Sequence, residues 1–364
     1  MRIVFVQAGI GAGGAEKIVN LLAHHRADLG NEVHVLAFGS RPGGSYFPYH
    51  ESVSVETLDG TGAADRRGIL RILRRVWWLR RRLAALRPDL IVSFLTKTNV
   101  LVMVASRGLR TPVVISERNH PDTQEAHPLW KPMSIFVARA AASVVMQTEA
   151  SRRILPPRLQ ARSDIIPNPC VLPKDVRATD GDGNRIIAVG RLVHQKGFDL
   201  LIEAFARLAP DAPQATLTIF GEGPEREALE AQVQGLGLGN RVQLPGVTDS
   251  PGEWLAAGDI FVMSSRSEGF PNVLVEALTG GLATVAFDAP WGASAILTDQ
   301  KFGILVPPED VEALAVAIRR LIGDPELRSA LRKATSEALE RFALPRVLAQ
   351  WDTVFEQAAG GASS

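Results

Sequence analysis

The chain has 364 residues, of which 46% are hydrophobic and 22% charged, and its formal net charge is +1. This length is enough for two globular domains, and the composition excludes a disordered or fibrous protein. No uncharged apolar run reaches the roughly 18 residues of a membrane span, and a single cysteine, Cys170, excludes an internal disulfide framework and is typical of the reducing cytoplasm.

The charge is distributed unevenly along the chain. Residues 1–175 contain 24 Lys and Arg against 14 Asp and Glu, whereas the remaining residues contain 16 against 25. One half is therefore basic and the other acidic. This asymmetry favours a basic surface on one domain over general nucleic-acid binding.

The first half alternates segments typical of strands and helices. It opens with an apolar strand at Ile3–Gln7, which is too short for a signal peptide, and a helix at Ala15–Leu29. Further strands are expected at Glu32–Ala37, Leu90–Phe94, Val113–Ser116, Ser143–Met146 and Asp164–Ile166. We therefore expect a first Rossmann-like domain over residues 1–173.

A second alternation follows a polar, Gly-rich stretch at 174–184, which we expect to be a linker. Its strands are expected at Arg185–Val189, Thr216–Phe220, Arg241–Leu244, Ile260–Met263, Ala283–Phe287 and Ile304–Val306. Helices are expected at Val311–Ile322 and Pro325–Arg341, so a second Rossmann-like domain would span 185–342. Such α/β alternation predicts parallel sheets covered on both faces, with ligands at the carboxyl ends of the strands.

A glycine-rich loop lies between the first strand and the first helix. Gly9 to Gly14 satisfy the G-x-G-x-x-G spacing of a dinucleotide site. Arg41, near the end of the second strand, would suit NADP better than NAD, because an NAD enzyme prefers an acidic residue there. An NADP-dependent oxidoreductase is therefore one candidate, although it leaves the motifs of the second half unexplained.

An arginine-rich helix is expected in the basic half. Eight Arg and no acidic residue lie between Arg66 and Arg82, together with Trp77 and Trp78. Its apolar residues recur at helical spacing: Ile69, Ile72, Leu73, Val76, Leu79, Leu83 and Leu86. The Arg residues that fall largely on the other side are Arg67, Arg71, Arg74, Arg75 and Arg82. They are either an ordinary solvated face or a surface for anionic lipid or an acceptor pyrophosphate.

The second half carries two motifs that together describe a nucleotide-sugar site. Arg191 and Lys196 follow an apolar strand and supply two cations for a diphosphate. Glu268 and Glu276, with seven residues between them, supply carboxylates for sugar hydroxyls. Pro271 suits a helix start, so the free amides of Asn272, Val273 and Leu274 would point at phosphate. Glu276 would lie one turn further along, and we assign Val247 to the same nucleotide site.

These motifs resemble those of the retaining glycosyltransferases of family 4, which have the GT-B fold of two Rossmann-like domains facing across a cleft. The resemblance implies that Arg191 and Lys196 neutralise the phosphates of the donor. It also implies that Glu268 meets the donor sugar and that Glu276 meets the ribose. By the same resemblance, Gly13 and Gly14 lie in a loop whose amides approach the donor phosphate or the acceptor. The last helix, near 343–357, would pack back on the first domain.

A narrower similarity is to bacterial transferases that add N-acetylgalactosamine to undecaprenyl-diphosphate-linked oligosaccharides. It rests on the segments 93–99, 111–117 and 168–170, and it implies a lipid-linked acceptor bound near a basic helix. The chain departs from that family after Ser116-Glu117. A histidine that contacts the transferred sugar is expected there, but Arg118 occupies the position and His120 follows, so either residue would take this role.

The combined expectation is transfer of a sugar from a UDP-sugar, with the anomeric configuration retained. The sugar would be of the GalNAc, Gal or Glc type. No D-x-D motif lies at a strand end, so we expect no metal and no other cofactor, with cations and helix amides stabilising the leaving diphosphate. The protein would act in the cytoplasm, on the inner face of the membrane. A non-catalytic nucleotide-sugar-binding protein is the third candidate, and it would be expected to lack some of the four motif residues.

Overall fold

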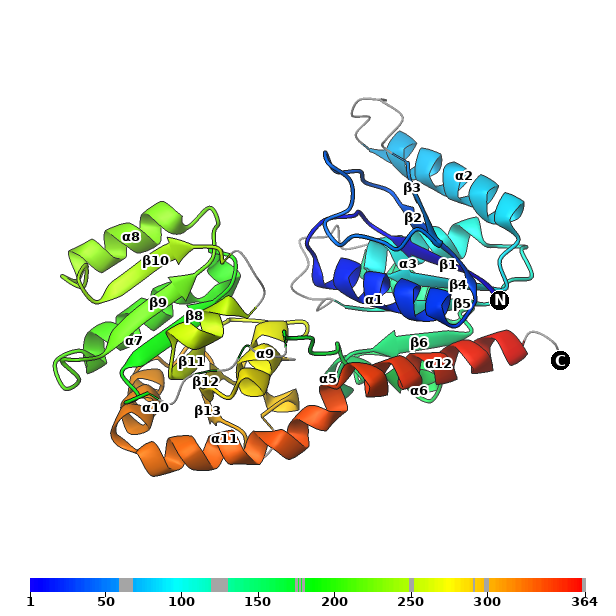
Figure 1. The fold of residues 1–364 in the computed structure, drawn as a ribbon. Helices are drawn as coiled ribbons and strands as arrows, with labels where there is room; N and C mark the ends of the chain where they lie inside the picture. The colour runs from blue at the N-terminus through cyan, green and yellow to red at the C-terminus, as the bar shows by residue number, and fades with distance from the viewer. Residues whose placement is uncertain are drawn as a thin grey trace. The chain divides into compact units, whose positions relative to one another are not determined.

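A computed structural model describes residues 1–58, 68–118, 130–173, 176, 178, 181–248, 252–290, 292–297 and 301–361 (Figure 1). The side chains of residues 131 and 336–338 are also outside this description. Contacts divide the chain into two compact units. The first consists of Met1–Asn168 and Pro345–Ser364, and the second of Pro169–Leu344.

The first unit is built on a seven-stranded parallel sheet. The strands are β1 (Arg2–Gln7), β2 (Glu32–Ala37), β3 (Val53–Thr57), β4 (Leu90–Phe94), β5 (Val113–Ser116), β6 (Ser143–Met146) and β7 (Ser163–Ile165). Their order is β3-β2-β1-β4-β5-β6-β7, and every neighbouring pair is parallel. The chain therefore starts at the centre of the sheet and winds outward in both directions.

Helices cover both faces of this sheet. They are α1 (Gly14–Asp28), α2 (Ile69–Leu86), α3 (Thr96–Ala105), α4 (Trp130–Ala138), α5 (Glu149–Arg152), α6 (Pro157–Gln160) and α12 (Leu344–Gly360). Alternate strand residues point to opposite faces. Ile3 and Phe5 accordingly pack against α1 and α12, whereas Val4 and Val6 pack against α2, α3 and α4.

The second unit repeats the design with six parallel strands in the order β10-β9-β8-β11-β12-β13. These are β8 (Arg185–Val189), β9 (Thr216–Phe220), β10 (Val242–Gly246), β11 (Ile260–Met263), β12 (Ala283–Phe287) and β13 (Ile304–Val306). Its α-helices are α7 (Phe198–Leu208), α8 (Arg226–Gly235), α9 (Asn272–Gly280), α10 (Val311–Gly323) and α11 (Pro325–Leu339). Short 3₁₀ turns occur at η2 (His194–Lys196), η3 (Glu253–Ala257), η4 (Ala293–Ala295) and η6 (Glu340–Phe342).

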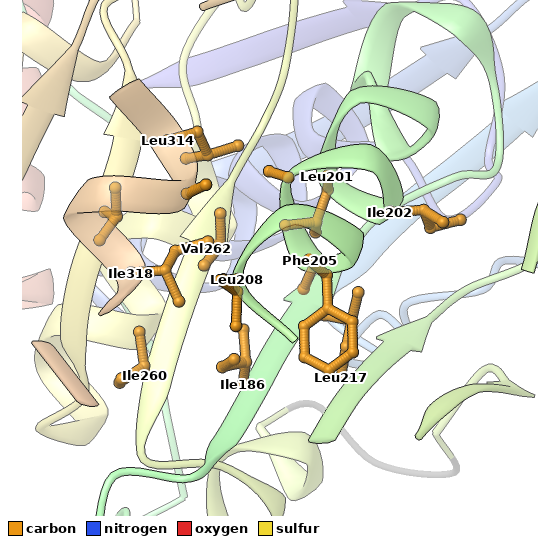
Figure 2. Close-up of a cluster of buried hydrophobic side chains, with 14 of the residues drawn as sticks. Ile186, Leu201, Ile202, Phe205, Leu208, Leu217, Ile260, Val262, Leu314 and Ile318 are labelled. Carbon is orange, nitrogen blue, oxygen red and sulfur yellow. The ribbon is translucent and has the colours of Figure 1, made fainter. Parts of the chain in front are cut away.

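The core of the second unit lies on both faces of its sheet. Phe205 of α7 and Ile318 of α10 pack with the strand residue Ile186 on one face (Figure 2). Phe261 and Leu274 belong to the core on the other face, which includes α9. The strongly apolar strands follow from this arrangement, because a parallel sheet is buried on both sides.

The segment at the start of the second unit packs on it. The Cys170 amide donates to the Phe342 carbonyl at 2.9 Å, and the Ala178 amide donates to the Gly280 carbonyl at 2.8 Å. The expected linker at 174–184 therefore falls within the residues assigned to the second unit, and residues 174, 175, 177, 179 and 180 lie outside the described part. Among the described helices, none combines the length and the apolar composition that a membrane span requires.

The parallel α/β architecture expected from the sequence is confirmed, but one strand was not predicted. β3 contains Glu56 and Thr57 among its five residues, and it lies at the edge of its sheet. An edge strand tolerates polar residues because one side meets no further strand. Its short, mixed sequence therefore lacks the apolar run that marked the other strands.

Candidate functional site

A largely buried ion pair joins the two motifs that the sequence singled out in the second half. The Lys196 ammonium donates to Oε1 of Glu268 at 2.5 Å. The hydroxyl of Ser265 donates to the same oxygen at 2.6 Å. Glu268 is 6% exposed, so its carboxylate is held almost out of water by these two donors. The pairing places a cation and a carboxylate in contact beyond the ends of β8 and β11.

Neighbouring strands explain why these residues meet. β8 and β11 pair side by side in the sheet, so the loops that follow them leave from the same edge. The Ser264 hydroxyl donates to the Lys196 carbonyl at 3.0 Å. The Gln195 amide group donates to the Ser267 carbonyl at 2.7 Å. We call residues 194–197 and 264–268 the paired loops.

Two glycines make this close approach feasible. Gly197 has φ +62°, in the left-handed region, and a Cβ there would clash with the Ser264 carbonyl. A Cβ on Gly292 would lie 2.8 Å from the Cβ of Glu268. Larger residues at either position would push the paired loops or the Glu268 side chain out of place.

Arg266, within the second of the paired loops, is already neutralised. Its guanidinium contacts both oxygens of Asp199, at 2.8 and 2.7 Å, and Glu309 at 3.0 Å. Partial burial raises the pKa of the Asp199 carboxyl, but the hydrogen bond and charge of Arg266, together with backbone amides of α7, outweigh it and lower that pKa on balance. Arg266 therefore fixes the loop to the first turn of α7 rather than offering a charge to a ligand.

Arg191 lies just beyond β8 and is exposed. Within the described part of the chain, no acidic side chain is paired with its guanidinium. Arg191 and Lys196 therefore supply two cations from one short segment. Val247, assigned to the same site, follows β10 and is 71% exposed.

The start of α9 differs in part from the expectation. The helix begins at Asn272, directly after Pro271, as predicted. However, the Leu274 amide donates to the Pro271 carbonyl at 3.0 Å, and the Asn272 amide donates to the Phe270 carbonyl at 3.0 Å. The prediction that all three first amides, Val273 included, are free was therefore wrong for these two. Glu276 lies one turn along α9 and is partly exposed.

The glycine loop of the first unit follows β1 and opens α1, as its spacing predicted. Gly13 is the N-cap of α1 and is exposed, as is Gly14. Burial raises the pKa of Glu16 in the first turn, partly offset by its own backbone amide. The side-chain amide of Gln7 donates to the Tyr49 hydroxyl at 3.3 Å, and burial raises the pKa of Tyr49 to about 12. Sequence analysis did not identify this polar cluster, because Tyr49 lies far from the loop along the chain.

Arg118, at the end of β5, is largely covered by the first unit. Its guanidinium lies over the rings of Phe94 and Trp351, at 5.5 and 5.3 Å, and donates to Asn168 at 2.7 Å. Burial lowers the pKa of Arg118 to about 9, against the charge of Glu117. Its Nε and Nη2 atoms have no hydrogen-bond partner among the described atoms. His120, the alternative, lies outside the described residues.

The arginines of α2 do not form one uniform face. Arg82 is paired with Glu56 of β3, and Arg75 lies over the ring of Phe38 at 5.0 Å. These two were expected to face an acceptor or membrane, but they contact the body of the unit instead. Arg71 is exposed and Arg74 is partly exposed, whereas Arg67 lies outside the described residues. Groups of three or more metal-ligating side chains were not found in the described part of the chain.

Two family models match the chain. The model described as "Glycosyl transferase 4-like domain" matches residues 13–169. The model described as "Glycosyl transferases group 1" matches residues 174–338. Together they cover both units, and the second includes the paired loops and α9.

Similar proteins act in the assembly of bacterial glycans. The chain is 32% identical to an exopolysaccharide phosphotransferase of Streptomyces coelicolor over 98% of its own length, but it spans only 41% of that relative. It is 25% identical to an N-acetyl-D-galactosaminyltransferase of Campylobacter jejuni whose name specifies a diphospho-undecaprenol-linked glycan, over 96% of this chain and 97% of that one.

Solved structures share the fold at low identity. HepE of Anabaena in complex with UDP superposes with a TM-score of 0.77 at 23% identity, covering 97% of this chain and 99% of that one. Sucrose-phosphate synthase of Thermosynechococcus elongatus gives a TM-score of 0.81 at 21% identity and covers both chains fully. These neighbours have the GT-B fold.

Proposed function

The chain belongs to the glycosyltransferases of family 4 with the GT-B fold, and we propose that it moves a sugar from a UDP-sugar to a lipid-linked oligosaccharide or related glycan. One observation carries the proposal for the donor. The paired loops bring Lys196 and Glu268 into contact at 2.5 Å, and Arg191 lies on the same connection between β8 and α7. A diphosphate and a sugar would therefore find cations and a carboxylate at one end of the sheet.

The ion pair suggests how a donor would be received. In the free protein, Lys196 and Ser265 both donate hydrogen bonds to Glu268. An arriving diphosphate carries more charge than one carboxylate and would draw Lys196 toward it. Glu268 would then be released from one donor and would accept hydrogen bonds from the hydroxyls of the sugar. Partner exchange would keep the Lys196 ammonium paired with negative charge and the Glu268 carboxylate hydrogen-bonded to hydroxyl donors.

The leaving group determines what the cations do during transfer. Breaking the bond between the sugar and the diphosphate leaves negative charge on the phosphate oxygens. Arg191 and Lys196 would stabilise that charge as it develops, which lowers the barrier more than equal binding of substrate and transition state would. We propose that no metal is required and that the anomeric configuration is retained. Glu276 would hold the ribose hydroxyls in both states.

The acceptor is assigned by similarity rather than by geometry. The Campylobacter relative is named for a diphospho-undecaprenol-linked glycan, and other similar proteins are named for lipopolysaccharide core biosynthesis. We propose that this chain takes an acceptor of the same chemical class, a saccharide on a polyprenyl diphosphate. Such an acceptor would place the protein at the inner face of the cytoplasmic membrane.

A ligand screen tests the donor directly. Thermal unfolding would be followed with UDP, GDP, ADP and NADPH, and hydrolysis of the matching nucleotide sugars would be measured with and without a chelator. A ligand present at about 100 times its Kd raises the free energy of unfolding by about 2.7 kcal/mol. We expect the shift with UDP, and hydrolysis of a UDP-sugar that the chelator leaves unchanged. Stabilisation by NADPH alone would instead identify an oxidoreductase.

A further inference from the structure

A cavity opens in the first unit at the edge of the sheet where its parallel strands begin. Residues 109–112, 142–143 and 161–164, which precede or begin β5, β6 and β7, line it together with the end of α12. Its volume is about 620 Å³, within the roughly 300–1,000 Å³ typical of small-molecule sites. Arg118 and the glycine loop follow the ends of β5 and β1, so they lie at the opposite edge. We call this space the amino-edge cavity, and it is a site separate from theirs.

The amino-edge cavity has an apolar floor and a basic rim. Val354 and Ala358 of α12 are buried and form the floor. Arg110 and Arg162 are exposed and stand at the rim. The Arg162 guanidinium donates to the Ala141 carbonyl at 2.9 Å. Among the described residues, however, neither of the two arginines is paired with an acidic side chain. The rim therefore offers two cations that no carboxylate of the unit neutralises.

The wall of the cavity carries hydroxyl groups that already donate their protons elsewhere. The Ser143 hydroxyl donates to Oδ2 of Asp164 at 2.8 Å. The hydroxyls of Ser163 and Thr111 each donate to a backbone carbonyl of the unit, at 2.8 and 2.9 Å. Each hydroxyl oxygen keeps lone pairs, and Oδ1 of Asp164 meets no donor among the described atoms. The wall is therefore equipped to accept hydrogen bonds from a ligand rather than to donate them.

The rim and the wall favour two different chemical groups on one ligand. Guanidinium groups bind phosphate through paired hydrogen bonds, so the rim favours a phosphate. A second anionic group would be repelled by Asp164, whereas hydroxyl groups would donate to its carboxylate and to the hydroxyl oxygens beside it. The apolar floor suits the C–H face of a sugar ring. A phosphorylated sugar combines these three properties in a molecule small enough for the cavity.

We propose that the amino-edge cavity binds a phosphorylated sugar. The phosphate contacts the guanidinium groups of Arg110 and Arg162, and the hydroxyls of the sugar donate to Asp164 and to the wall. This ligand is distinct from the proposed donor, whose site lies in the second unit, and it leaves the opposite edge of the first sheet free. The inference goes beyond the proposed function and does not depend on it, since binding here requires neither a nucleotide sugar nor an acceptor.

Calorimetric titration of the full-length protein tests whether both groups of the ligand are recognised. The probes are glucose 1-phosphate, glucose 6-phosphate, glucose and inorganic phosphate. We expect at least one of the two sugar phosphates to bind at least about tenfold more tightly than glucose or inorganic phosphate, because each of the latter satisfies only one part of the lining. Equal affinity for inorganic phosphate would show a simple anion site and would overturn the proposal. Failure of both sugar phosphates to bind would overturn it as well.

Variants of the rim assign the binding to this cavity. Arg110→Gln with Arg162→Gln should weaken binding of the sugar phosphate at least about tenfold, because the charge-assisted hydrogen bonds to phosphate are lost. Arg107→Gln with Arg158→Gln is the matched control, since both arginines are exposed on the same unit but outside the lining. The control should bind like the wild type. Circular dichroism melts establish that each variant is folded, and equal binding by the rim variant and the wild type would contradict the proposal.

A variant of the wall tests recognition of the sugar even if the rim variant fails to fold. Asp164→Asn keeps the shape of the side chain but removes its negative charge. It should weaken binding of the sugar phosphate, whereas inorganic phosphate should bind as well as before or more tightly. The reverse pattern would overturn the proposal, and so would displacement of the sugar phosphate by UDP, because the ligand would then occupy the donor site. UDP affinity, which the rim variant should retain, reports separately on the proposed function.

Discussion

The Lys196–Glu268 contact gives each residue a role in the free protein as well as in the complex. Glu268 is buried and is neutralised by Lys196, with Ser265 as a second donor. Removing the carboxylate would leave the ammonium without its partner, whereas replacing it by an amide keeps the shape and the hydrogen bond. Substitution to Gln is therefore more informative here than substitution to Ala.

Substitutions of the two glutamates, Glu268 and Glu276, should affect UDP binding and turnover differently. Glu268→Gln removes the negative charge that competes with a diphosphate for Lys196, so UDP affinity should be retained or increased, while turnover falls because the sugar is no longer oriented by a carboxylate. Glu276→Gln should weaken UDP binding, because ribose hydroxyls are held in ground and transition states alike. Calorimetric titration with UDP and initial rates test both. The opposite order for UDP affinity would show that the two roles were assigned the wrong way round.

At this scale, the sequence identified residue types but not all of their partners. Lys196 and Glu268 were recognisable because their motifs have the spacing of the resembled family, and the structure shows that the strands before them pair in the sheet. Arg82 was misjudged, because its partner Glu56 lies on β3, the strand that the sequence did not reveal. Leu274 was misjudged because its amide closes a turn onto Pro271, a geometry that the residue pattern does not specify.

The paired loops are the element on which the site depends. They are held by Gln195 to Ser267 and by Ser264 to Lys196, and Arg266 fixes them to α7 through Asp199. Gly197 lies where the backbones approach most closely. Gly197 therefore meets two separate requirements: a left-handed backbone conformation, with φ +62°, and the lack of a Cβ where the loops touch. A second glycine that has a left-handed φ but open space around it separates the two requirements.

Gly197→Ala should destabilise the protein more than Gly237→Ala. Both glycines have left-handed φ, +62° and +70°, but a Cβ on Gly237 would meet nothing within 4 Å. Gly237→Ala should therefore cost only about 1–2 kcal/mol for the backbone conformation. Gly197→Ala should cost about 1–3 kcal/mol more, because the paired loops must separate. Urea denaturation measures the difference, and equal costs would contradict the close packing.

α2 shows where helical periodicity is insufficient. Its apolar residues recur at the expected spacing, and Leu79 and Leu83 are indeed buried. Leu73 was expected on the same apolar side, yet it is 57% exposed. Periodicity identifies which apolar residues share one side of a helix, but it does not show which side faces the sheet. In α2, the buried apolar residues and the exposed ones both recur at helical spacing.

Across the whole molecule, both units use the same parallel winding, which the alternation of strands and helices made predictable. α12 belongs to the first unit although it ends the chain, and the fully buried Trp351 packs there against Phe94 and Phe355. The Arg118 guanidinium lies against the same ring. The family resemblance predicted that the last helix packs on the first unit, and α12 does so. It did not indicate that Arg118 would lie against Trp351.

The central claim is that the paired loops form the donor site of a glycosyltransferase, and one measurement tests it most directly. Turnover of the UDP-sugar that the wild type uses would be compared in Lys196→Ala and Arg207→Ala. Arg207 is a cation of the same unit that is paired with Glu203 and Glu312 on the surface. Loss of Lys196 should reduce turnover by about 10²–10³, because charge stabilisation of the leaving diphosphate is removed, whereas Arg207→Ala should turn over like the wild type. Equal turnover by Lys196→Ala and the wild type would contradict the account.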